Sequence, residues 1–416
     1  MPPNRTSIIT GIALLLLAVS TYHFVSSAYA SQRYGFVDFP IFLQRAALFA
    51  DGGDLYVDTA DPDAYAPAAA VYKFPPFFAV LLLPFVRSAP MSIYLGHFWL
   101  QLALYLLAVA LALAGLRCPR RGIFICAGAL LALNFEPFFE TLWRLQLETA
   151  MLLLLVGMVL SARRGRDGLA GAALGIATAL KLYPGFLLLY FLVRRRFRVV
   201  LYALLAGALV QLACLIVLGV ETNRVFFLDV LPILLRESPV GTSENVGLAR
   251  YALLLFGADP AVAKRVAQLA LLLLTAATLL TVEKNRRAGV DRGTVELAAM
   301  IPLMLLSTPN SWVNYQLLLL PALLVLFAKG IGRRLDWGVL APALAASALL
   351  LFYWPCAEPA VGWPCARTPD FLGIHALPRR LHDVGVDLRG LATLLVWATA
   401  SFVAGGAERD ERERPG

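Results

Sequence analysis

Long apolar runs, separated by short clusters of basic residues, are the feature that most limits how this chain can fold. About 20 consecutive apolar residues let a helix cross the hydrocarbon core of a bilayer, where backbone polar groups must pair within the helix itself. Hydrophobic residues make up 60% of the 416 residues and charged residues only 15%, whereas soluble chains are about 25% charged. The sequence therefore predicts an all-α polytopic membrane protein.

Five basic clusters set the expected topology. They lie at 117–121, 163–167, 194–198, 283–292 and 329–336. Because Lys and Arg gather in cytoplasmic loops, the apolar runs between the clusters are expected to be paired crossings. This predicts a bundle of about 12 transmembrane helices in the cell (plasma or inner) membrane, with both termini in the cytoplasm. The net charge of +9 is thus explained by topology, and no nucleic-acid partner is expected.

A single transmembrane domain is expected over 1–406, with a cytoplasmic tail at 407–416. The first outer loop is placed at 30–90 and the last at 354–388. Long ordered loops in compact domains are usually functional, so the outer face is the expected place for an active site.

The beginning of the chain allows two interpretations. The first apolar run ends in Ala28-Tyr29-Ala30, which is typical of a signal-peptide cleavage site. An uncleaved first span is preferred because many more spans follow. The loop after it is expected to carry two interfacial helices: an amphipathic one at 39–49, and a short one opening at Lys73-Phe74-Pro75-Pro76 that ends near Phe85, too soon to cross.

Cys356 and Cys365 lie in a doubled Trp-Pro-Cys sequence within the last outer loop. A disulfide is chemically permitted outside the cell, and two free thiols are the alternative. The other three of the five cysteines lie in or beside apolar runs and are expected to be packing residues.

Asp38 is the first candidate for chemistry, because it follows the first span directly. One interpretation is an N-cap of the next helix, with Pro40 in its first turn. The other is a catalytic carboxylate held at the membrane surface by an interfacial helix. The two interpretations do not exclude each other.

Lys181 interrupts two short apolar runs, and a cation there needs an anionic partner or water. Snorkelling at a helix end and binding of an anionic lipid head group are both consistent with its position. Other polar side chains at outer helix ends and turns are candidate substrate contacts, although each also suits a wetted helix end: Arg144, Gln146, Asn245, Arg250, Ser311, Asn314 and Tyr315.

No metal site is predicted, because none of the four histidines has ligand spacing with another. Asp51, Asp54 and Asp58 could hold a divalent metal, but Asp51-Gly52-Gly53-Asp54 is more typical of a turn. A divalent metal as cofactor therefore stays open, and no other cofactor is expected.

The order of several motifs resembles glycosyltransferase family 87, a family of polyprenol-phosphate-mannose-dependent alpha-mannosyltransferases of the C-type glycosyltransferase superfamily. The motifs are an Asp soon after the first span, then ADGGDLYV, YKFPPFFAVLLLPF, the segment 168–198 with ALKLYPGF, and STPNSWVNYQLLLLPALL at 307–324. Each motif is loose by itself, and their order across most of the chain carries the resemblance.

This resemblance implies a C-type glycosyltransferase-like bundle in which Asp38 is the general base of a single inverting displacement. Lys181 and the turn at 308–316 would then stabilise a lipid phosphate, together with Asn245 and Arg250. Asn314 and Tyr315 stand where the family often has histidines. Both side chains can hydrogen-bond a phosphate, but neither can carry a positive charge.

The predicted function is transfer of a sugar (mannose or another hexose or pentose) from a polyprenyl-phosphate donor to a glycan, glycolipid or protein acceptor at the outer face. The alternative is a transporter or flippase of lipid-linked sugars. A flippase would also need about 12 spans and broken helices, but it would not need an Asp beside the membrane in a long outer loop.

Overall fold

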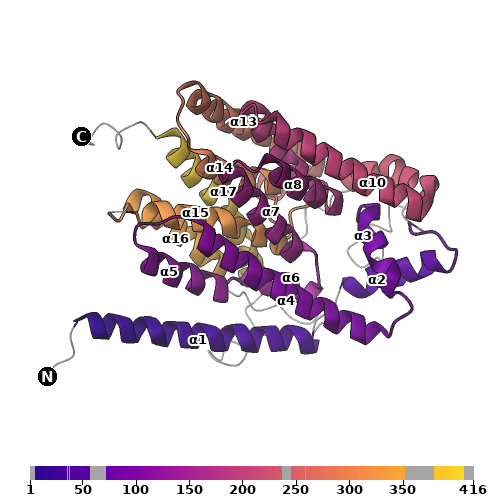
Figure 1. The fold of residues 1–416 in the computed structure, drawn as a ribbon, viewed down its shortest axis with the longest axis horizontal. Coiled ribbons are helices and arrows are strands. Elements are labelled where there is room, and N and C mark those ends of the chain that lie inside the picture. The colour runs from indigo at the N-terminus through magenta and orange to yellow at the C-terminus, as the bar shows by residue number, and fades with distance from the viewer. Residues whose placement is uncertain are drawn as a thin grey trace.

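The computed structural model shows a helical bundle (Figure 1). It describes residues 5–34, 36, 38–56, 72–236, 245–257, 259–308, 310–332, 334–351 and 379–406. Within these ranges the only extended pairing is one isolated bridge between Asn245 and Trp312. The all-α prediction is confirmed. The candidate disulfide Cys356–Cys365 and the predicted tail at 407–416 lie outside the described residues.

Among the described residues, six segments are long and apolar enough to cross a membrane. A bent pair of helices, with 41° between α5 and α6, adds a seventh if it is one broken span. The structure therefore confirms a polytopic membrane protein, while about 12 crossings stays a prediction. The segments are Thr10–Arg33 in α1 (Arg5–Tyr34), α4 (Pro90–Gly115), Phe197–Leu235 with α10 (Phe197–Val225), α13 (Pro260–Arg287), Val313–Gly330 with η5 (Val313–Leu319) and α15 (Leu320–Gly330), and Leu388–Gly405 in α17 (Arg379–Gly405); the bent pair is α5 (Arg121–Leu133) and α6 (Glu136–Arg144).

Shorter helices complete the bundle. They are α2 (Phe39–Ala50), α3 (Pro76–Leu82), η2 (Leu83–Phe85), α7 (Glu148–Arg163), α8 (Asp167–Leu180), η3 (Tyr183–Leu187), α9 (Leu188–Val193), η4 (Phe226–Val230), α11 (Leu231–Arg236), α12 (Leu248–Phe256), α14 (Gly293–Leu306) and α16 (Trp337–Leu351). The expected short helices of the first outer loop are present as α2 and α3. The expected break after Leu180 is present as the 3₁₀ turn η3, which contains Pro184.

Burial separates the central helices from the peripheral ones. The span that includes α15 is 83% buried, whereas those of α1, α10 and α13 are 17% buried. A helix that is apolar all round belongs in the interior, and α14 and α15 fit this description. The exposed leucines and valines of α1, α10 and α13 form the surface that lipid would cover.

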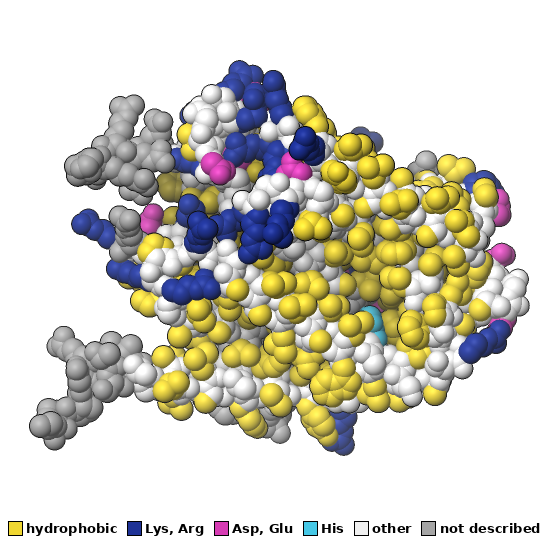
Figure 2. Space-filling view, viewed as in Figure 1, with side chains coloured by type: hydrophobic (Ala, Val, Ile, Leu, Met, Phe, Trp, Pro, Cys, Tyr) yellow, Lys and Arg dark blue, Asp and Glu magenta, His cyan; other side chains and the backbone are white. Residues whose placement is uncertain are grey.

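Contacts among the basic clusters show that their helices end together. The Arg163 guanidinium donates to the carbonyl of Gly115 at 2.9 Å, Arg196 pairs with Asp167, and Arg292 donates to carbonyls at the C-terminal end of α17. Figure 2 shows Lys and Arg gathered at this end, where Figure 1 also places the beginning of α1 and the end of α17. We refer to it as the basic end of the bundle.

Close packing of α8 on α10 determines where the C-terminal end of α8 lies. A Cβ atom at Gly171 would meet the carbonyl oxygen of Val199, and one at Gly175 would meet that of Ala203. Small residues four apart on one helix face let two helices approach closely. The backbone of α8 therefore rests directly on α10.

Two helices extend beyond the apolar runs. The stretch from Pro137 to Gln146, between two apolar runs, is mostly helix α6. Helix α17 begins at Arg379, within the predicted last loop, and the apolar span inside it begins at Leu388, where that loop is predicted to end. Hydropathy marks where a helix becomes apolar, whereas a helix continues through polar residues that are compatible with it, such as those of 379–389.

Candidate active site

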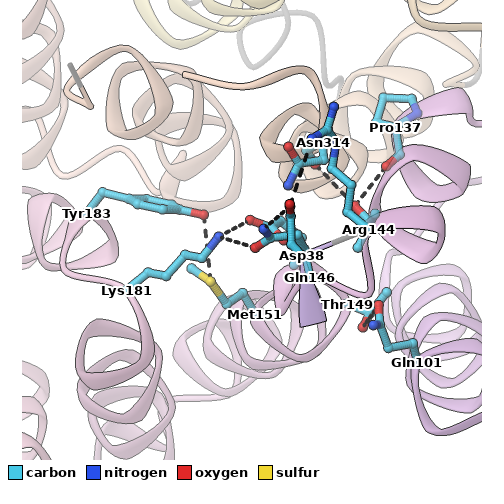
Figure 3. A network of polar contacts seen from close by, with 12 residues as sticks. Asp38, Gln101, Pro137, Arg144, Gln146, Thr149, Met151, Lys181, Tyr183 and Asn314 are labelled. Atoms are coloured by element: carbon cyan, nitrogen blue, oxygen red, sulfur yellow. Dashed lines mark hydrogen bonds and ion pairs between the residues drawn. The ribbon is translucent and has the colours of Figure 1, made fainter. Parts of the chain in front are cut away.

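Asp38 lies at the centre of a polar cluster formed by segments far apart in the sequence (Figure 3). Asp38 is the N-cap residue of α2, as one interpretation predicted, but its side chain makes no capping hydrogen bond to the helix. Instead the amide nitrogen of Gln146 donates to Asp38 Oδ2 at 2.7 Å, and Arg144 Nη1 lies 3.9 Å from the same oxygen. The carboxylate is about a quarter exposed, with 24% of the side chain accessible.

Backbone contacts hold the Asp38 segment against the end of α6. The Phe36 N–H donates to the carbonyl of Trp143 at 2.7 Å, and the Asp38 N–H to that of Arg144 at 3.4 Å. At this point the chain reverses through Leu145, whose φ of 50° is left-handed and costly for a residue other than glycine. This reversal lets Arg144 and Gln146 both face Asp38.

Lys181 is buried and ion-paired. Its ammonium contacts the carboxylate of Glu148 and donates to Gln146 Oε1 at 3.3 Å. The ring of Phe74 lies 4.9 Å from the ammonium nitrogen and that of Tyr315 lies 4.3 Å from it. Only 5% of the residue is exposed, so the snorkelling interpretation is wrong and the required anionic partner is Glu148.

Asn314 and Tyr315 extend the cluster from η5. Tyr315 stacks on Tyr183 with ring centroids 5.5 Å apart. Asn314 is 3% exposed, and its backbone carbonyl accepts from the Thr141 hydroxyl at 3.4 Å. Its side-chain nitrogen has no hydrogen-bond partner within the described ranges, and Figure 3 draws the residue in the same polar network as Asp38. A buried amide N–H without a partner is costly. The position therefore suits a binding site in which a ligand supplies the acceptor atom.

Asn245 and Ser311 join two segments that lie far apart in the sequence. Asn245 Oδ1 accepts from the backbone N–H groups of Gly247 at 2.9 Å and Ser311 at 3.3 Å. The Val246 N–H donates to the Ser311 carbonyl at 2.6 Å. These bonds hold the segment that leads into η5. Arg250, in α12 on the other side of this junction, is 6% exposed.

Lys73 is a candidate that the sequence reasoning did not select. It is half-buried and electrostatically coupled to Asp38; burial lowers the pKa of its ammonium, and the Asp38 carboxylate opposes that change. The Tyr56 hydroxyl donates to the carbonyl of Phe74 at 2.9 Å and so fixes the neighbouring backbone. A cation at the start of an otherwise apolar run was the available signal.

The part of the chain that the structure describes contains no group of three or more His, Cys, Asp or Glu side chains arranged for a metal. Asp51 instead forms an exposed ion pair with Arg87 at 2.7 Å. Asp58 lies outside the described residues.

The fold and the site together define an integral membrane protein with a carboxylate-centred polar site. That site lies away from the basic end, because α7 and α8 each run between the two. Comparison with known proteins identifies the class further. The model of glycosyltransferase family 87 matches residues 72–309, more than half of the chain. The chain belongs to glycosyltransferase family 87 and is a membrane glycosyltransferase.

Two relatives cover most of the chain. A polyprenol-phosphate-mannose-dependent alpha-(1-2)-phosphatidylinositol mannoside mannosyltransferase of Mycobacterium tuberculosis is 27% identical over 91% of this chain and 86% of its own length. A polyprenol-phosphate-mannose-dependent alpha-(1-2)-phosphatidylinositol pentamannoside mannosyltransferase of Mycolicibacterium smegmatis is 27% identical over 86% of this chain and 85% of its own. Asp38, Asn314 and Tyr315 lie outside the range that the family model matches.

Proposed function

We propose that this enzyme transfers a sugar from a polyprenyl-phosphate donor to a glycolipid acceptor at the outer face of the cell membrane, with Asp38 as general base. Mannose is the proposed sugar, since both relatives are named for mannose transfer. The observation that carries the proposal is the Asp38 carboxylate, which is held by Gln146 and lies beside Arg144.

The proposed reaction is a single displacement. Asp38 removes the proton from an acceptor hydroxyl as that oxygen attacks the anomeric carbon. The bond between the anomeric carbon and the phosphate oxygen breaks, and its electron pair leaves with the polyprenyl phosphate. A new glycosidic bond forms with inversion, and the proton stays on Asp38 until it passes to water.

The leaving group is an anionic lipid phosphate, so the site needs cations and hydrogen-bond donors near Asp38. Arg144 and Lys73 are the proposed cations, because Arg144 lies 3.9 Å from the carboxylate and Lys73 is coupled to it. Asn314 is the proposed neutral donor, because its buried side-chain nitrogen lacks a partner among the described residues. We assign these residues to the phosphate and Asp38 to the acceptor.

The proposed depth of the active site in the membrane follows from the length of helix α7. Helix α7 runs for 16 residues from Glu148 in the site to Arg163 at the basic end, which corresponds to about 24 Å at 1.5 Å per residue. The hydrocarbon core is about 30 Å thick. If the basic end faces the cytoplasm, the site lies near the opposite interface, where a lipid phosphate would be.

The test is a transfer assay in membrane vesicles with labelled polyprenyl-phosphate mannose, comparing wild type with Asp38→Asn. We expect kcat to fall by about 10²- to 10⁴-fold, the usual contribution of a general base. Asp51→Asn is the matched control, since Asp51 lies in the same predicted loop and forms an exposed ion pair with Arg87. Full activity of Asp38→Asn would overturn the assignment. Lipid movement without a new glycosidic bond would contradict the proposed reaction and favour a flippase.

A further inference from the structure

We propose that Glu148, Lys181 and Gln146 form a chain of positioning residues that sets which oxygen of Asp38 accepts the proton. This inference rests on the proposed function, in which Asp38 is the base. The contacts follow one another: the Lys181 ammonium pairs with Glu148 and donates to Gln146 Oε1 at 3.3 Å, and Gln146 Nε2 donates to Asp38 Oδ2 at 2.7 Å. Figure 3 shows Lys181, Gln146 and Asp38 in this network.

The direction of the Gln146 amide is the first step. An amide group has an acceptor oxygen at one end and two N–H donors at the other. A flipped amide would turn its oxygen toward the Asp38 carboxylate and its N–H groups toward the Lys181 ammonium. Both contacts would then be repulsive. Lys181 therefore selects the orientation in which Gln146 donates to Asp38.

The surroundings of Lys181 are the second step. An ammonium has three N–H donors and no acceptor. Glu148 and Gln146 take two directions, and the rings of Phe74 and Tyr315 lie within 4.9 Å and 4.3 Å of the nitrogen. Because the side chain is also buried, the ammonium is fully engaged by protein groups. This environment fits a positioning role better than direct contact with the lipid phosphate.

Glu148 is the third step. It is fully buried at 0% exposure and lies in the first turn of α7, where the helix dipole favours a negative charge. Its second oxygen, Oε2, has no hydrogen-bond partner among the described residues. Lys181 is thus the main stabilising contact of Glu148. Gln146 and the rings of Phe74 and Tyr315 in turn surround the Lys181 ammonium.

These contacts make the two carboxylate oxygens of Asp38 different from each other. Gln146 and Arg144 both approach Oδ2, so the chain of contacts assigns Oδ2 to the protein. Oδ1 is then the oxygen that accepts the proton of the acceptor hydroxyl. Loss of the chain removes the 2.7 Å bond and leaves the longer Arg144 contact at 3.9 Å. The carboxylate is then held less firmly, and correctly aimed encounters become rarer.

The experiment measures kcat and KM for donor and acceptor in three variants. Gln146→Leu removes the donor to Asp38. The paired variant Glu148→Leu/Lys181→Met removes both buried charges, so that neither is left uncompensated. The third variant combines all three changes.

Two comparisons separate positioning from folding. The matched control is Glu296→Leu/Arg194→Met, which removes a similarly buried ion pair (2.8 Å) at the basic end. Asp38→Asn is measured in parallel. It separates failure of this inference from failure of the proposed function.

We expect Gln146→Leu and the paired variant each to lower kcat by about tenfold or more, with both KM values within about twofold of wild type. The triple variant should fall no further than the more severe of the two, because the residues act in series. The basic-end control should keep its kcat.

Three results would overturn the chain. A higher donor KM with unchanged kcat would place Lys181 on the lipid phosphate instead. A wild-type kcat in Gln146→Leu, with Asp38→Asn inactive, would refute the chain and leave the base assignment intact. Full activity of Asp38→Asn would refute both.

Discussion

Replacing Gly175 by alanine is expected to push α8 away from α10 and to destabilise the protein. A Cβ atom at this position would overlap the carbonyl oxygen of Ala203 and lie 2.9 Å from the Cβ of Ala206, whereas ordinary contact begins at 3.4 Å. The blocking atom is part of a helix backbone, which cannot move aside as a flexible side chain can. The two helices must therefore separate by about half an ångström or more.

The magnitude follows from two opposing effects. Overpacking that forces a backbone shift costs about 1–3 kcal/mol, and the upper part of that range applies because a carbonyl oxygen is in the way. Alanine in place of glycine within a helix recovers about 1 kcal/mol. We expect a net loss of about 2 kcal/mol in the free energy of unfolding. Since Lys181 follows the end of α8, transfer activity should fall as well.

The assay is unfolding of the purified protein in detergent, with loss of helix monitored by far-UV circular dichroism. The control is Gly157→Ala in the middle of α7, where an added Cβ meets no atom within 4 Å. This control should be stabilised by up to about 1 kcal/mol. Equal stability of the two alanine variants would refute the reasoning that α8 packs through its glycines.

Two further predictions concern the buried ion pair and the sidedness of the site. Lys181→Met alone should cost about 3–5 kcal/mol by leaving Glu148 uncompensated, whereas Glu148→Leu/Lys181→Met should be close to wild type in the same unfolding assay; strictly additive losses would contradict a coupled pair. In a cysteine-free background, Asp54→Cys should react with an impermeant maleimide on intact cells and Arg287→Cys only after permeabilisation. The reverse pattern would invert the proposed topology.

Several features of the fold follow directly from local sequence. The apolar runs predict helices because unpaired backbone groups are intolerable in lipid. The side-chain period of residues 39–49 predicts the amphipathic helix α2, and its buried residues Phe39 and Phe42 lie on the expected face. The break at Lys181 to Pro184 is local too, since proline cannot donate to a continuing helix.

The roles of individual polar residues were less predictable. Asp38 and Gln146 are 108 positions apart, and Lys181 and Glu148 are 33 apart. A periodic pattern places a residue on a helix face but does not say which other helix that face meets. Asn245 shows the consequence, because a predicted substrate contact is also the acceptor that joins two backbone segments.

The sequence by itself thus determined that this is a membrane protein, which segments are helices, and at which helix ends polar groups gather. These properties depend on residue type and near neighbours. Only the tertiary structure decided that Lys181 is neutralised by Glu148, that Lys73 is coupled to Asp38, and that Gln146 lies between the ion pair and the carboxylate. Those contacts depend on how closely α8 approaches its neighbours and on the reversal at Leu145, and both are set by packing between helices.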